Sequence, residues 1–446
     1  MPNHAVVIGA SVAGLLAAAA LSKTCPRVTV YERDALASGP EPRRGVPQCR
    51  QLHALQARGV QALDELLPGL RDELVAAGGV ACDMQADTHW YLDDYLVKPA
   101  PSGLEAMGMT RLRLEWLIRS RVAALPGVTI TDATDVVRLE TAGGRVTGVT
   151  VRAARTHGAA EETVPADLVV DAAGRGSRTP VWLRDVGLAA PATTRIRAGV
   201  TYVSRVYRRD PGQLGGRFGT LVTPYPGRPF GGAVLRQEDD RWMALIMGMT
   251  GTEPPAGEDG MAAFAGTFAA PDIATVMRES EPLSEPMKYT FPESARNHYE
   301  RLREYLGGLL VIGDAFCSFN PIYGQGITVA ALEALILRDL LSGTAGEGLE
   351  RRYFQAAGQL VAEAWETSAS SDLRFREVEG RRRLGAGLIN AYGEKFRAAA
   401  SVDASLGQTF LRVANMLDKP AKLLSPGTVV RVFRSAGKAV KAGQHK

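Results

Sequence analysis

Gly9, Ser11 and Gly14 follow directly on the short apolar run Val6-Val7-Ile8 and precede an alanine-rich stretch. This order predicts a strand, a tight turn and a helix. In such a unit the first glycine permits the turn, and the free N–H groups at the helix N-terminus bind a pyrophosphate. Ser11 stands where a second glycine is usual, and its hydroxyl can donate a hydrogen bond to a phosphate oxygen. The segment therefore predicts a turn that binds a dinucleotide.

A second apolar run, residues 28–31, ends at Glu32. An acidic residue about 20 residues after such a turn accepts hydrogen bonds from ribose hydroxyls, and we expect Glu32 to do so. The stretch 5–21 is apolar enough to imitate a signal-peptide core or a short membrane segment. However, no Lys or Arg precedes it, and Gly and Ser residues interrupt it. We therefore predict a strand-helix-strand unit in a cytoplasmic protein.

A second glycine-bearing segment lies far along the chain and begins with the apolar run 308–312, followed by Gly313-Asp314. A carboxylate at the end of a strand can accept hydrogen bonds from the hydroxyls of a ribitol chain. Pro321 then interrupts the helical pattern, and glycines beyond it allow the backbone to approach a flat ring. The residues expected at that ring are Gly324, Gln325 and Gly326. Taken alone, this segment is more typical of an ordinary strand, loop and buried helix.

The two segments together resemble class A flavoprotein monooxygenases of the para-hydroxybenzoate hydroxylase type. The late motif of that family, G-D-A, a proline and then G-x-G, matches Gly313-Asp314-Ala315, Pro321 and residues 324–326. A middle element of the Asp-Gly type resembles residues 168–178, which contain Asp171. The resemblance implies FAD as the cofactor, NADPH or NADH as the co-substrate, and O2 as the oxidant.

A narrower resemblance rests on residues 43–48, on His53, and on residues 319–324 and 377–380. The residues in these segments are similar to those of a branch of the family that contains bacterial polyether-pathway epoxidases and, more distantly, squalene epoxidases. The chain departs from that branch and from the wider family near the expected flavin edge. The departures are Cys49, Gln51 and Phe316-Cys317.

The resemblance also implies the fold class, α/β with a Rossmann-like FAD-binding domain, a mixed or antiparallel-sheet substrate domain and a C-terminal helical region. The boundaries we expect are 1–75, 106–182 and 296–345 for the FAD-binding domain, 76–105 and 183–295 for the substrate domain, and 346–446 for the helical region with its basic tail.

Period-two alternation in the middle of the chain predicts an antiparallel sheet with strands at 201–207, 232–236 and 242–247. The last two strands are expected to form a hairpin over residues 238–240. The sequence leaves open whether the odd-numbered or the even-numbered residues of 242–247 line the substrate pocket. A methionine-rich wall would suit a bulky, flexible apolar substrate.

Residue roles follow from the resemblance, motif by motif. Gly9, Ser11 and Gly14 would bind the pyrophosphate and Glu32 the adenosine ribose. Guanidinium groups suit phosphate, and the resemblance assigns further cofactor contacts to Arg43, Arg44, Arg111, Asp171, Asp314, Gly324, Gln325 and Gly326. The candidate catalytic residues are His53, Pro321 and Tyr323. His53 could protonate or position a substrate oxygen, although a lone histidine is more often structural.

The family chemistry implies that NADPH or NADH reduces FAD, that O2 forms a C4a-hydroperoxide, and that its distal oxygen passes to an electron-rich carbon. Our leading expectation is epoxidation of an alkene in a lipophilic polyketide or isoprenoid secondary metabolite. The alternative is hydroxylation of a phenolic polyketide, which needs a base; the candidates are His53, Tyr202 and Tyr323. A halogenase is disfavoured, because the Trp-x-Trp-x-Ile-Pro segment is missing. A redox-silent flavin-binding protein is the non-enzymatic alternative.

Composition argues against other classes of function. The net charge of +4 over 446 residues, without a nucleic-acid-binding motif, argues against nucleic acid. The four cysteines lack the spacing of a metal site or a disulfide framework, so we expect no metal. The final stretch is rich in basic residues, namely Lys419, Lys422, Arg431, Arg434, Lys438, Lys441 and Lys446. We expect a solvated tail, with weak contact to an anionic membrane surface as the alternative.

Overall fold

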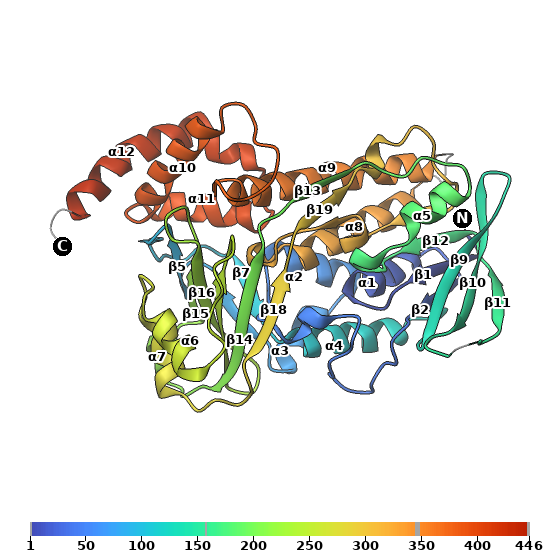
Figure 1. Ribbon diagram of the computed structural model, residues 1–446, viewed down its shortest axis with the longest axis horizontal. Helices are drawn as coiled ribbons and strands as arrows, with labels where there is room; N and C mark the ends of the chain where they lie inside the picture. The colour runs from blue at the N-terminus through green and yellow to red at the C-terminus, as the bar shows by residue number, and fades with distance from the viewer. Residues whose placement is uncertain (1, 157, 344–347, 444–446) are drawn as a thin grey trace.

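A five-stranded parallel sheet forms the centre of the larger layer of the molecule (Figure 1). The computed structural model describes residues 2–156, 158–343 and 348–443. The strand order is β20-β12-β1-β2-β8, with β1 at His4–Ile8, β2 at Arg27–Tyr31, β8 at Val128–Thr131, β12 at Leu168–Asp171 and β20 at Leu309–Val311. Because the strands are parallel, the carboxyl ends of β1, β2, β12 and β20 meet at one edge. The predicted α/β fold class is confirmed.

Helices cover this sheet because its strands are apolar on both faces. Helix α1 (Val12–Leu21) lies against β1 and β2 and is itself covered by α8 (Gly326–Ser342) and α4 (Arg111–Ala123). Its small alanine side chains permit this close packing, and nine of its ten residues are buried. Helices α2 (Ala57–Leu66) and α9 (Leu349–Asp372) pack on α8. The late helix predicted from Ile327 is therefore confirmed, and it packs directly on the first one (Figure 1).

A seven-stranded sheet forms the second layer, in the order β18-β14-β17-β16-β15-β5-β6. Its strands are β5 (Thr88–Leu92), β6 (Tyr95–Leu96), β14 (Val200–Arg208), β15 (Gly219–Val222), β16 (Phe230–Gln237), β17 (Arg241–Gly248) and β18 (Met287–Phe291). The predicted hairpin is confirmed, because β16 and β17 pair antiparallel across residues 238–240. Asp239 and Asp240 both have positive φ, as the tight turns of two-stranded hairpins require.

The structure decides which face of β17 points toward the parallel sheet. Trp242, Ala244 and Ile246 pack under α6 (Glu258–Ala265) and α7 (Asp272–Glu279) in a core of their own. Leu245 and Met247 belong instead to the main core, together with Tyr202 of β14 and the strands of the parallel sheet. The odd-numbered face of β17 is therefore the one turned toward the candidate cofactor site.

Further strands and helices complete the fold. They are β3 (Ala54–Leu55), β4 (Val80–Asp83), β7 (Glu105–Gly108), β9 (Thr134–Ala142), β10 (Arg145–Ala153), β11 (Glu161–Pro165), β13 (Thr193–Ile196), β19 (Ser294–Asn297), β21 (Cys317–Ser318), α3 (Leu70–Ala76) and α5 (Thr179–Asp185). Short 3-10 helical turns occur in the loops at Pro47–Arg50, Gly174–Gly176, Gln213–Gly216, Tyr299–Arg301, Gly313–Ala315, Pro321–Tyr323 and Pro420–Leu424.

The C-terminal region is helical, as predicted, and ends in α10 (Ala386–Ala400), α11 (Ala404–Ala414) and α12 (Pro426–Gly443). These helices lie at the end of the molecule beside β5 and β6 (Figure 1). Asp93, in the turn between those two strands, forms ion pairs with Arg374, which follows α9, and with Arg397 of α10. These ion pairs attach the helical region to the sheet. Within the described residues, no helix has both the length and the hydropathy needed to cross a membrane.

Candidate active site

The predicted glycine motifs meet at the carboxyl edge of the parallel sheet. A β-carbon on Gly9, where φ is +100°, would lie 2.7 Å from the carbonyl oxygen of Ala172 in the middle motif. A β-carbon on Gly313, where φ is +66°, would lie 2.7 Å from the β-carbon of Ala13 in α1. Both positions need glycine, because any side chain would collide and the backbone lies in the left-handed region. Three segments far apart in the sequence thus form one cradle of backbone.

Glu32 is fixed beside the first turn. Its carboxylate is buried and accepts hydrogen bonds from the backbone N–H groups of Ala10 at 2.9 Å and Asp34 at 3.0 Å. The guanidinium of Arg43 lies 2.7 Å from Oε2 of Glu32. The predicted contact between Glu32 and the adenosine ribose stays a prediction, and the structure puts the carboxylate at the edge where that contact requires it.

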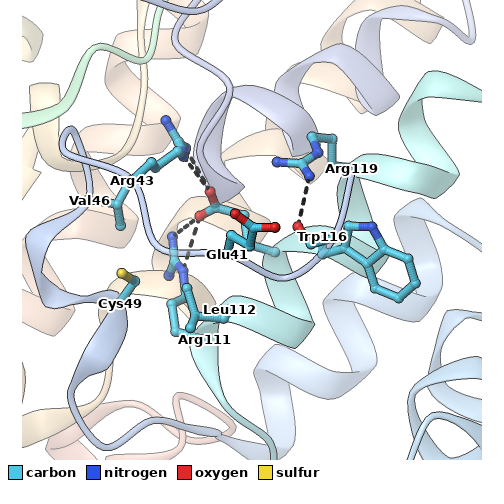
Figure 2. Close-up of a pocket in the computed structure, with 10 residues that line it drawn as sticks. Glu41, Arg43, Val46, Cys49, Arg111, Leu112, Trp116 and Arg119 are labelled. Atoms are coloured by element: carbon cyan, nitrogen blue, oxygen red, sulfur yellow. Dashed lines mark hydrogen bonds and ion pairs between the residues drawn. The ribbon is translucent and has the colours of Figure 1, made fainter. Parts of the chain in front are cut away.

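Glu115 joins the two arginines that the sequence suggested for phosphate. Its Oε1 lies 2.6 Å from Nη2 of Arg43, and its Oε2 accepts a hydrogen bond from Nη2 of Arg111 at 3.0 Å. The same Nη2 donates to Oγ of Ser11 at 2.9 Å, and that hydroxyl donates to Glu115 at 3.0 Å. Arg43 and Arg111 are labelled in Figure 2, where dashed lines mark the interactions of their guanidinium groups. Ser11, Arg43 and Arg111 are therefore brought together at the N-terminus of α1.

Electrostatics keeps this buried cluster charged. Burial alone would raise the pKa of Glu115, but the guanidinium groups of Arg111 and Arg43 outweigh that effect and hold the pKa below its usual range. Sequence reasoning missed Glu115. Its spacing of four residues from Arg111, which brings the two side chains together on the helix Arg111–Ala123, was the available signal. A pocket beside the cluster is lined by Gly39, Glu41, Arg43, Val46, Cys49, Arg111, Leu112, Glu115, Trp116 and Arg119.

Asp314 provides the test of whether the site suits a polyhydroxylated ligand. Its carboxylate makes no hydrogen bond with any described residue, and it sits in the helical turn Gly313–Ala315 that follows β20. Burial raises its pKa, and the charges of Arg111 and Arg175 oppose that rise. A partly buried carboxylate without donors beside a glycine cradle and a helix N-terminus is the arrangement that the ribitol and pyrophosphate of FAD require. The residues present therefore fit this cofactor.

Glu333, on α8, supports the turn that carries Asp314. The backbone N–H of Gly313 donates to Oε2 of Glu333 at 2.8 Å. The side chain is fully buried, and burial raises its pKa to about 8. Glu333 is therefore mostly protonated at neutral pH, which avoids a second negative charge beside Asp314. The sequence showed no signal for this role, because the residue lies within an apolar helical pattern.

Asp171 and Arg44 have different surroundings from the other predicted cofactor residues. Asp171 is buried and accepts hydrogen bonds from the hydroxyls of Ser177 and Thr179, both at 2.5 Å, and from the N–H of Ala173 at 2.8 Å. Its carboxylate thus holds the middle loop in shape, and its contact with a cofactor stays a prediction. Arg44 is exposed and makes no ion pair within the described residues, whereas its neighbour Arg43 is buried in the cluster.

The late loop presents backbone toward the open side of the site. Pro321, Gly324 and Gly326 are exposed, whereas Gln325 is buried, and Gly324 has a left-handed φ of +64°. This pattern suits the approach of a flat ring to the backbone. The placement agrees with the predicted role of these residues, which stays a prediction.

Tyr323 is anchored through its hydroxyl to a buried network. Its Oη donates to Oδ1 of Asp372 at 2.7 Å, and Nδ2 of Asn320 donates to the same oxygen at 2.9 Å. Oη of Tyr202 donates to Oδ1 of Asn320 at 3.1 Å. Burial raises the pKa of Asp372 to about 7. The network joins the late loop to α9 and to the substrate sheet, and sequence reasoning missed Asn320 and Asp372.

His53 lies near the charged groups of Arg111 and Glu115. Its Nδ1 donates to the carbonyl oxygen of Gln51 at 2.9 Å, which leaves Nε2 as the acceptor. Burial and the nearby charge of Arg111 lower its pKa to about 4. At neutral pH this histidine is therefore neutral, so it can accept a hydrogen bond from a substrate but holds no proton at Nε2 to donate.

Gln51, one of the departures from the family pattern, contacts the substrate sheet. Its Oε1 accepts a hydrogen bond from Oγ of Ser204 at 2.6 Å, and its Nε2 donates to the carbonyl of Met287 at 3.2 Å. Both side chains of the first pair are buried. This pair ties the loop after Arg50 to β14 and β18.

Comparison with known proteins supports this assembly. The model of the FAD binding domain family matches residues 3–368. The chain is 34% identical over 430 residues to Protein Rv3254 of Mycobacterium tuberculosis, covering 93% of this chain and 90% of that protein. It is 28% identical to kynurenine 3-monooxygenase of Salinispora arenicola, covering 80% of this chain and 76% of that protein.

The fold is also that of solved flavoproteins. The structure of the flavin-dependent brominase Bmp2 superposes with a TM-score of 0.68 at 15% identity, covering 98% of this chain and 100% of that one. At this identity the likeness shows the fold alone, whereas the match of the family model spans most of the chain. The chain therefore belongs to the FAD binding domain family and is a class A flavin-dependent monooxygenase that uses FAD with NADPH or NADH.

Proposed function

We propose that this monooxygenase epoxidises an alkene in a lipophilic secondary metabolite, a polyketide or an isoprenoid. The observation that carries the proposal is that none of the three residues considered as bases is suited to take a proton from a phenol. His53 has a pKa lowered to about 4 by burial, and the hydroxyls of Tyr202 and Tyr323 have pKa values raised well above 10, also by burial. An alkene needs no ionisation before it accepts an oxygen atom, so an epoxidase does not require such a base.

FAD, when bound, supplies electron transfer from NADPH or NADH to O2. The chain's own residues would bind and orient it. The N-terminus of α1, Ser11, Arg43 and Arg111 would hold the pyrophosphate, Glu32 the adenosine ribose and Asp314 the ribitol. The exposed backbone of residues 324–326 would lie against the ring.

The substrate would lie between this ring and the odd-numbered face of β17. Leu245 and Met247, with Tyr202, give that face an apolar surface from which water is excluded. Such a wall suits a long apolar molecule with few polar groups.

The test uses labelled oxygen. The purified FAD-loaded enzyme, given NADPH or NADH and a lipophilic polyene, is expected to incorporate one atom from 18O2 into an epoxide. A product that carries oxygen from water alone would refute the proposal. Absence of any oxygen-dependent consumption of the reduced nucleotide, with every polyene and phenol tried, would favour the redox-silent alternative.

Aromatic hydroxylation is the second candidate, and one observation favours it. Tyr323 donates to Asp372, whose pKa is raised to about 7 by burial. A phenolic substrate could pass its proton to Tyr323 while Tyr323 passes its own to Asp372. Asp372→Asn would then abolish hydroxylation of a phenol, whereas it would leave epoxidation of an alkene within about threefold of the original rate, because no proton transfer is needed.

A further inference from the structure

The C-terminal helices carry an unusual concentration of exposed apolar side chains. Within the described residues, six large hydrophobic side chains are more than half exposed, and all six lie between residues 384 and 433. The other exposed large hydrophobic side chains reach 40% at most. The six are Leu384, Leu388, Ile389, Leu424, Val430 and Phe433. We call this set the C-terminal apolar surface.

Leu388 and Ile389 lie on α10, and Val430 and Phe433 lie on α12. Leu384 lies in the turn before α10, and Leu424 ends the short helical turn Pro420–Leu424. Val432 of α12 is fully buried with Phe396 and Ala399 of α10 in a small core. Its neighbours Val430 and Phe433, on the other side of the same helix, are 58% and 56% exposed. Helix α12 therefore packs on α10 with one face and presents apolar side chains on another, so its exposed apolar residues are not explained by the internal packing.

Basic side chains lie beside members of the C-terminal apolar surface. The ammonium of Lys395 lies 5.0 Å from the centre of the Phe433 ring, so cation and apolar side chain share one surface. Lys422 and Arg434 are exposed and form no ion pair with the described residues. From Lys419 to the last residue the sequence contains no Asp or Glu. The predicted basic residue Lys446 lies outside the described residues, as do the side chains of Lys438 and Lys441.

We propose that this region binds the surface of an anionic lipid bilayer. Exposed Leu, Ile, Val and Phe side chains enter the boundary between headgroups and acyl chains, while Lys and Arg pair with anionic headgroups. A second copy of this chain would bring the same positive charge to the interface, which repulsion disfavours. The surface thus favours lipid over self-association. Contact with a bilayer would give the enzyme access to a lipophilic substrate, but the binding itself does not depend on the proposed function.

The experiment is co-sedimentation of the full-length, FAD-loaded protein with vesicles. One set contains phosphatidylcholine alone, and the other contains phosphatidylcholine and phosphatidylglycerol in equal parts. The protein is expected to pellet with the anionic vesicles only, and high salt is expected to reduce pelleting because it screens the charges. Failure to pellet with anionic vesicles at low salt would overturn the proposal.

Matched variants separate this surface from general stickiness. Leu388→Ser with Phe433→Ser, and Lys422→Glu with Arg434→Glu, are each expected to weaken binding at least roughly tenfold. The controls place the same changes elsewhere, at Val181 with Leu283 and at Lys23 with Arg184, and should bind like the unchanged protein. All of these residues are exposed, so melting temperatures are expected to stay within about 2 °C. Equal losses in the controls would contradict the proposal. One further result would also overturn the proposal. Light scattering would show a dimer that dissociates only in the variant Leu388→Ser with Phe433→Ser, and the unchanged protein would not bind vesicles.

Discussion

Gly313 approaches Ala13 so closely that a β-carbon at position 313 would lie 2.7 Å from that of Ala13. This contact joins the turn after β20 to the first turn of α1. It places Asp314 beside the helix N-terminus that would receive the pyrophosphate. The early and late motifs are therefore halves of one site, held in register by the absence of a side chain at position 313.

Gly313→Ala is expected to destabilise the protein by about 2 kcal/mol, because φ is +66° and the new methyl meets Ala13. FAD affinity should fall as well, since the turn must shift. Denaturant unfolding and a flavin fluorescence titration measure the two effects. Adding Ala13→Gly should recover part of both losses. No recovery in the double variant would show that the contact with Ala13 is not the cause.

Asp314→Ala is expected to weaken FAD binding roughly ten- to hundredfold, the range for losing a hydrogen bond to a charged group. The melting temperature of the FAD-free protein should not fall, because Asp314 makes no hydrogen bond with the described residues and its charged form is disfavoured by burial. A flavin-loaded variant with full yellow colour and turnover would show that the late motif has been misinterpreted.

Glu115→Gln is expected to cost about 3 kcal/mol at neutral pH, because it leaves Arg111 without its buried counter-charge and Arg43 with Glu32 alone. The pKa of Glu115 is depressed in the folded protein. Its contribution is therefore fully present above the pKa of an unfolded glutamate and is lost as pH falls through the lower folded value. The stability difference between the two proteins should shrink at acidic pH.

A matched control for Glu115→Gln is Glu73→Gln, which breaks the exposed ion pair with Arg121. This change should cost at most about 1 kcal/mol. FAD titrations of both variants complete the test. Normal FAD affinity in Glu115→Gln would contradict a role for Glu115 in positioning the two arginines.

Asp372→Asn should change how stability depends on pH. Burial raises the pKa of Asp372 to about 7 in the folded protein, so the folded state binds this proton more tightly than the unfolded chain. The original protein should therefore lose stability relative to the variant as pH rises from about 4 to about 7. The asparagine oxygen can still accept hydrogen bonds from Tyr323 and Asn320. Parallel stability curves would indicate that Asp372 is charged throughout this range.

His53→Gln is expected to lower kcat by less than about tenfold, below the range typical of a general acid or base. The pKa of His53 is lowered to about 4, so the histidine stays neutral over the working range. The pH–rate profile between about pH 6 and 8 should therefore keep its shape in the variant. Loss of an ionisation from that profile would assign His53 a proton-transfer role.

Short-range pattern in the sequence determined the elements of the site. The strand, turn and helix around Gly9, the helix that follows Gly326, and the hairpin across residues 238–240 were all predictable, because each depends on neighbours within about 20 residues. Glycine at positions 9 and 313 was informative for the same reason, since its role depends on local backbone conformation.

Only the tertiary structure decided which charged and polar groups meet. Glu115 pairs with Arg43 from 72 residues away, and Asp372 lies 49 residues from Tyr323. It also decided that Arg43 is buried while Arg44 is exposed, and which face of β17 turns toward the cofactor site. Burial and hydrogen-bond partners are set by segments that are distant in the chain and adjacent in space, and local spacing carries no record of that proximity.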